Sequence, residues 1–142
     1  MASNLRTLRT TAIVGLLGIA VTHALELPDK LEETGLIYQG VMFAALIIGC
    51  ILLAAAAGKS PAGPWWAGAL LLGALPLIGY VLSRTVGLPN GPDDIGAWGD
   101  PSGIASLVFE ALTIGVSARA LQLLPAAAVR TRAARGRAAA RA

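Results

Sequence analysis

The sequence predicts an all-α polytopic membrane protein, a bundle of four transmembrane helices. Hydrophobic residues make up 56% of its 142 residues and charged residues only 13%, whereas soluble domains are about 45–50% apolar and about 25% charged. The hydrophobic residues gather in four runs, each long enough to cross the roughly 30 Å hydrocarbon core as a helix. The runs lack the alternation of polar and apolar residues that is typical of a membrane β-barrel.

Each predicted span is bounded by polar or turn-forming residues. The spans cover about 9–27, 35–57, 64–83 and 102–124. Proline and glycine in 58–63 predict a tight turn, so the second and third spans should be antiparallel neighbours. The longest connection, 84–101, contains prolines and glycines but no periodic pattern, and loops of this length are often functional. We therefore expect one transmembrane domain over 1–127 and a basic cytoplasmic tail over 128–142.

The distribution of charge predicts that both chain termini lie in the cytoplasm. Arg6 and Arg9 precede the first span, Lys59 follows the second, and five arginines lie in the tail. Segments on the cytoplasmic side carry the excess of Lys and Arg. All but one of the eight carboxylates fall in or directly beside the other two connections, so the outer face should attract cations. Trp65 and Trp66 are expected as anchors at the inner membrane interface.

Glu110 is the one carboxylate deep inside a predicted span. It lies roughly 12–14 Å into the fourth span at about 1.5 Å per residue. A carboxylate at such a depth is costly, and it usually faces the bundle interior or a water-filled cavity. Two interpretations stay open: a ligand-binding group, or a structural carboxyl that is hydrogen-bonded to a neighbouring helix.

His23, the only histidine, lies near the outer end of the first span. Glu26 shares its helix face, and Met42 lies at a similar depth in the second span. These three residues are the predicted metal site, for a divalent or copper ion, with haem ranked below. The alternatives are a histidine that bonds a carboxylate within the bundle and a methionine that only packs.

Other polar residues map to the same outer half of the predicted bundle. Tyr38 begins the second span, Tyr80 and Arg84 end the third, and Trp98 lies in the long connection. Convergent polar groups within an apolar bundle are typical of a ligand pocket. We therefore predict an outward-facing polar pocket under 84–101. Its predicted ligand-binding residues are Glu110, Arg84, Tyr80, Tyr38 and Trp98.

Two stretches of the chain carry a resemblance. Within 80–110, Ser-Arg-Thr-Val-Gly-Leu-Pro is followed by acidic residues, a tryptophan and Gly-Ile-Ala-Ser-Leu-Val-Phe-Glu, while 23–43 has a histidine and paired acids before the second span. These patterns resemble an uncharacterised family of small four-helix actinobacterial membrane proteins, over most of 15–120. The resemblance implies the fold and a bacterial cytoplasmic membrane but no activity. It draws attention to His23, Glu32, Glu33, Ser83, Arg84, Trp98 and Glu110.

Three functions stay open at this point. The favoured hypothesis is a membrane protein whose outer pocket binds a cation, including a transition metal, or another small ligand. The second is an accessory subunit of a larger membrane complex. The expected partners are the lipid bilayer and either further copies of the chain in a homo-oligomer or such a complex. The third is an intramembrane enzyme in which His23 and Glu110 act on a lipid or quinone, but the sequence contains no nucleophile motif or phosphate-binding loop. The basic residues accompany no nucleic-acid-binding motif, so nucleic acid is not an expected partner.

Overall fold

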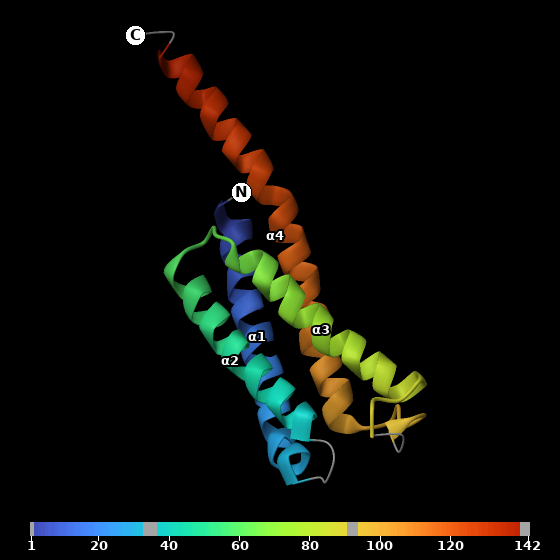
Figure 1. The fold of residues 1–142 in the computed structure, drawn as a ribbon. Coiled ribbons are helices and arrows are strands. Elements are labelled where there is room, and N and C mark those ends of the chain that lie inside the picture. Colours follow the sequence, from blue (N-terminus) through green and yellow to red (C-terminus); the bar gives the residue numbers. More distant parts are fainter. Residues whose placement is uncertain (1, 33–36, 91–93, 140–142) are drawn as a thin grey trace.

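A computed structural model describes residues 2–32, 37–90 and 94–139, and the side chains that lie between residues 4 and 124 of those ranges. Its helices run up and down as a bundle (Figure 1): α1 (Ala2–Glu32), α2 (Ile37–Lys59), α3 (Trp65–Thr85) and α4 (Pro101–Ala139). Each contains a segment long and apolar enough to cross a membrane. The predicted four-helix transmembrane bundle is therefore confirmed, and the chain is a multi-pass membrane protein.

The two ends of the bundle differ in charge. We call one the basic end; its described charges are those of Arg6, Arg9, Lys59 and Arg119. The opposite, acidic end carries Asp29, Glu32, Asp94 and Asp100. Glu33 and Asp93, which the sequence also assigns to the acidic end, lie outside the described residues.

Two helices extend beyond their predicted spans. α1 continues through Pro28 to Glu32, although an internal proline removes one backbone hydrogen bond. Its last turn is held by a close contact with α2, because a Cβ on Gly40 would lie 2.6 Å from Cδ2 of Leu31. α4 continues to Ala139, so residues 128–139 of the expected tail extend the fourth helix.

The four helices do not pack evenly. α1 packs along α2 and α4, and α4 packs along α3, whereas α2 and α3 make few contacts with each other. Those contacts lie towards the basic end, where a Cβ on Gly49 would lie 2.9 Å from Leu72 and a Cβ on Gly68 would lie 3.1 Å from Leu53. Towards the acidic end α2 and α3 diverge (Figure 1). The bundle is therefore closed on three sides and open between α2 and α3.

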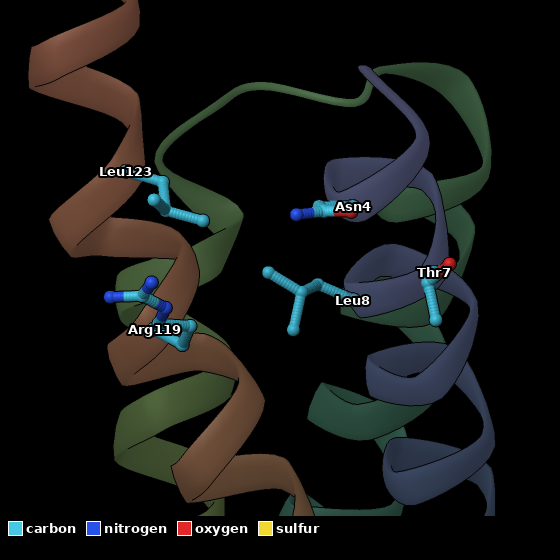
Figure 2. Close-up of a pocket in the computed structure, with 5 residues that line it drawn as sticks. All are labelled: Asn4, Thr7, Leu8, Arg119 and Leu123. Carbon is cyan, nitrogen blue, oxygen red and sulfur yellow. The ribbon is translucent and has the colours of Figure 1, made fainter. Parts of the chain in front are cut away.

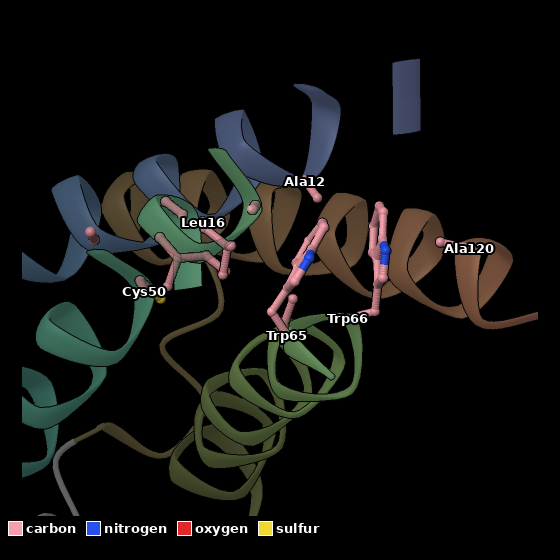
Figure 3. Packing of buried hydrophobic residues seen from close by; sticks show 11 residues of the cluster. Ala12, Leu16, Cys50, Trp65, Trp66 and Ala120 are labelled. Carbon is pink, nitrogen blue, oxygen red and sulfur yellow. The ribbon is translucent and has the colours of Figure 1, made fainter. Parts of the chain in front are cut away.

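The apolar core lies towards the basic end, around two stacked indoles (Figure 3). The ring centroids of Trp65 and Trp66 are 3.9 Å apart, and both side chains are buried. The expectation that these rings anchor the protein at a lipid interface is wrong. Ala12 and Ala120 belong to the same buried cluster, and such small side chains leave room that large rings fill.

Candidate functional site

A cavity of about 660 Å³ lies among the helices, on the acidic side of the core. Each helix lines it with residues three or four positions apart, which is the spacing of one helix face. Its volume is within the roughly 300–1,000 Å³ range of small-molecule sites. The cavity is therefore the candidate binding site.

The back wall of the cavity, formed by the adjacent helices α1 and α4, is polar. α1 contributes Thr22, His23, Glu26 and Lys30, and α4 contributes Ser102, Ser106 and Glu110. The side walls below the acidic end are mainly apolar. α2 contributes Met42, Phe43 and Leu46, and α3 contributes Leu72, Leu75 and Pro76. The cavity thus has a polar back and apolar sides along the gap between α2 and α3.

Glu110 lies deep in this cavity and is only 2% exposed. Ser106, one turn earlier on α4, donates a hydrogen bond from Oγ to Oε1 at 2.6 Å. Oε2 is buried and has no hydrogen-bond partner among the residues that the structure describes. A purely structural role for this carboxyl requires a hydrogen bond from a neighbouring helix, and the described residues supply none. A buried oxygen without a partner costs roughly 1–3 kcal/mol, and this cost points to a group that the cavity receives.

His23 faces the cavity from α1 and is 8% exposed. Its Nδ1 lies 2.9 Å from the carbonyl oxygen of Ile19. Since a carbonyl can only accept, Nδ1 is the protonated nitrogen, and Nε2 is left as an acceptor in the neutral ring. The ring also meets Phe43 of α2 edge-on, with centroids 4.7 Å apart. The histidine therefore forms its hydrogen bond with the backbone. The sequence predicts, as the structural alternative, a hydrogen bond with a carboxylate within the bundle.

The predicted metal residues line the same cavity, but the described residues do not support a metal site there. His23 and Glu26 lie on the wall formed by α1, and Met42, which is 63% exposed, lies on the rim formed by α2. Within residues 4–32, 37–90 and 94–124, no group of three His, Cys, Asp or Glu side chains is placed to hold a metal ion. The metal and haem hypotheses thus gain no support from the described residues.

Arg84 lines the cavity at the acidic end and anchors residues 94–100. Its Nη1 lies 2.6 Å from Oδ1 of Asp94, and its Nη2 lies 3.5 Å from Oδ2 of Asp100. The guanidinium also lies over the ring of Tyr80, 4.9 Å from the centroid. The charge of Arg84 is therefore largely engaged within the protein, although the sequence predicts it as a ligand-binding residue.

Asp100 also fixes the start of α4. Its carboxylate accepts hydrogen bonds from the backbone N–H groups of Ser102 and Gly103, at 3.3 and 3.1 Å. An aspartate at this position caps the free N–H groups of a helix, and Pro101 at the first helical position needs no such partner. Arg84 and Asp100 thus set the position of α4 relative to α3 beside the cavity.

The three predicted aromatic residues differ in their position. Tyr80 lines the cavity, and its hydroxyl donates to the carbonyl of Trp98 at 3.4 Å. Trp98 is 47% exposed and lies outside the cavity wall, as does Tyr38. The hydroxyl of Tyr38 instead donates to the carbonyl of Pro89 at 2.8 Å, which joins residues 86–90 to α2. Tyr38 and Trp98 therefore support the site from outside.

Sequence reasoning missed several polar residues of the cavity. Gln39 is 5% exposed and lines the cavity from α2, with its Nε2 donating to the hydroxyl of Tyr38 at 3.3 Å. Ser106 was not identified either, although its position four residues before Glu110 places both on one helix face. A search for polar residues at this spacing from an intramembrane carboxylate would have found it.

A smaller cavity of about 220 Å³ lies between α1 and α4 at the basic end (Figure 2). It is lined by Asn4, Thr7, Leu8, Arg119 and Leu123. All three of its polar residues are exposed, and Arg119 bonds Gln122 at 3.3 Å. This shallow cavity offers no buried polar atom to a ligand, in contrast to the one that contains Glu110.

The chain matches no protein-family model, no curated protein and no solved structure. The resemblance to the actinobacterial family therefore stays a prediction.

Proposed function

We propose that this membrane protein binds a small organic cation in the cavity at its acidic end. The observation that carries the proposal is the carboxyl of Glu110, which is buried on the cavity wall with Oε2 lacking a partner among the described residues. Ionisable residues within membrane segments are costly and mark ligand or ion pathways. A ligand N–H group would supply the missing hydrogen bond, and its charge would strengthen that bond.

The charges around the cavity favour a cation. Its described wall contains four carboxyl groups, those of Glu26, Asp94, Asp100 and Glu110, and two basic groups, those of Lys30 and Arg84. Two of the four carboxylates already pair with Arg84. The remaining excess of acidic groups creates a potential that attracts positive charge.

The other features of the cavity suit the organic part of such a ligand. The side walls are apolar, as is usual for sites that bury most of a small molecule. On the back wall, Nε2 of His23 is an acceptor because Nδ1 is engaged with Ile19, so a second ligand N–H can be bound. The accessory-subunit and enzyme hypotheses gain no comparable observation from the described residues.

The test uses 2-phenylethylammonium with the purified full-length protein in detergent, and measures binding by calorimetry. Replacing Glu110→Gln keeps the size of the side chain but removes its charge, and we expect the affinity to fall by at least about tenfold. Glu32→Gln is the matched control, because this exposed carboxylate at the same end is not part of the cavity wall. Equal binding to wild type and Glu110→Gln, or no binding to either, would refute the proposal, as would equal affinity for the neutral 2-phenylethanol.

We also propose that the acidic end faces the outside of a bacterial cytoplasmic membrane. The basic residues near α1, α2 and the C-terminal part of α4 support this orientation, because Lys and Arg accumulate on the cytoplasmic side. The test labels intact cells with a membrane-impermeant maleimide, in a Cys50→Ala background. Ile95→Cys should react in intact cells and Ala62→Cys only after lysis; the opposite pattern would reverse the orientation.

A further inference from the structure

The gap between α2 and α3 extends from the acidic end down the side of the cavity. Met42 on one edge is 63% exposed and Leu75 on the other is 53% exposed, although both line the cavity. Below them, Leu46 and Leu72 close the cavity towards the basic end, where α2 and α3 meet. The cavity is therefore open sideways, through the surface that these two helices present.

The depth of this opening places it beside lipid acyl chains. Leu75 lies about 15 Å from the end of α3 at Thr85, by the roughly 1.5 Å rise per residue. The hydrocarbon core of a bilayer is about 30 Å thick, so Leu75 lies near its middle. An apolar chain in the membrane can contact Met42 and Leu75 without leaving the hydrocarbon.

The acidic end of the cavity is covered in a different way. Residues 86–90 and residues 94–100 are each tied to a helix that borders the gap. Tyr38 of α2 bonds the carbonyl of Pro89, and Arg84 of α3 forms an ion pair with Asp94. The bond between Tyr38 and Pro89 crosses the top of the gap, and the ion pair holds Asp94 against α3, whereas the side towards the lipid has no such link among the described residues. The sideways route is therefore the less obstructed one.

From this arrangement we infer that the ligand is a membrane-dissolved, single-chain amine that reaches the cavity sideways between α2 and α3. The inference rests on the proposed cation site, since the ammonium group binds Glu110 and His23 on the polar back wall. The alkyl chain lies between the apolar walls of α2 and α3 and extends into the bilayer. The polar back wall matches the ammonium group of such a molecule, and the apolar side walls match its alkyl chain.

Gly79 provides a way to obstruct this route. It lines the cavity from α3, and a Cβ added there would meet no atom within 4 Å. A tryptophan at this position therefore has an unobstructed Cβ, from which its ring can extend into the space beside the gap. Gly115 of α4 is the matched control: its added Cβ also meets nothing, and it lies outside the cavity wall.

The experiment uses full-length protein in lipid nanodiscs and a dodecylamine with a photoreactive diazirine near the end of its chain. Mass spectrometry then locates the attached label. We expect it on Met42, Leu46, Leu72 and Leu75. Excess 2-phenylethylammonium should compete with it, and Glu110→Gln and Gly79→Trp should each lower the yield by about tenfold. Gly115→Trp should leave the yield unchanged.

Two results separate failure of this inference from failure of the cation site. Labelling of α2 and α3 that persists in Glu110→Gln, or that is unaffected by Gly79→Trp, would refute sideways access. Alkyl chains would then occupy the gap without reaching the carboxyl. The cation site survives that result when 2-phenylethylammonium still requires Glu110 in detergent. If 2-phenylethylammonium binding does not depend on Glu110, both the cation site and the present inference are refuted.

Discussion

The basic and acidic ends of the bundle use the same four helices in opposite ways. At the basic end α2 and α3 meet through Gly49 and Gly68, and stacked indoles fill the space between small side chains. At the acidic end the same two helices diverge, and polar side chains of α1 and α4 face a cavity. The comparison indicates that tight packing at one end lets the other keep a polar cavity.

This division predicts where substitutions cost stability and where they cost binding. Natural proteins keep strained or unsatisfied groups at functional sites and obtain their stability elsewhere. Of the three described buried polar atoms without a partner, Oε2 of Glu110 and Nε of Arg84 belong to residues that line the cavity, and Oγ of Ser117 lies on α4 towards the basic end. Both indole N–H groups at the basic end are bonded, to the carbonyls of Ser60 and Pro61. Substitutions at the two ends can therefore test the comparison directly.

The largest loss of stability is expected at the basic end. Trp66→Ala empties the centre of the core, and the free energy of unfolding should fall by about 3–5 kcal/mol. The measurement is reversible unfolding in mixed detergent micelles, followed by circular dichroism. Trp98→Ala is the control, because this ring is 47% exposed and its edge contact with Tyr80 is worth only about 1 kcal/mol. Equal losses for the two variants would contradict the location of the core.

An intermediate effect is expected where the segment 86–100 is anchored. Arg84→Ala leaves Asp94 and Asp100 without their shared partner, and stability should fall by about 2 kcal/mol. The same variant should be cleaved faster by protease within 86–100, because the segment loses its link to α3. Arg119→Ala, at the exposed basic end, removes only one bond to Gln122, so its stability should change by less than about 0.5 kcal/mol. Unchanged protease resistance in Arg84→Ala would show that other contacts hold the segment.

The sequence was sufficient for the helices and for part of the cavity. Length and hydropathy identify spans because no other structure satisfies the backbone of an apolar run in lipid. Depth along each span was enough to bring His23, Glu26, Met42, Tyr80, Arg84 and Glu110 to one cavity. Helical spacing alone then determines which neighbours share the face of each of these residues.

The remaining features depend on contacts between distant parts of the chain. The indoles of Trp65 and Trp66 are buried because Ala12 and Ala120 leave space beside them, and no local pattern reveals that pairing. Tyr38 was placed in the pocket by its depth, but it faces Pro89, fifty-one residues away. The gap between α2 and α3 is likewise a property of the whole bundle. The short turn between these two helices would by itself predict that they pack closely.

Among the residues of the cavity, a small change in stability is expected at the one that matters most for binding. In Glu110→Gln the hydroxyl of Ser106 can still donate to the remaining carbonyl oxygen, and the amide keeps the shape of the carboxyl. The free energy of unfolding should therefore change by less than about 1 kcal/mol, measured in the same micelles. If the variant instead lost as much stability as Arg84→Ala, the carboxyl would be part of the scaffold, and the acidic end would resemble the basic end. A stable variant that no longer binds 2-phenylethylammonium would mean that the polar cavity is maintained for its ligand.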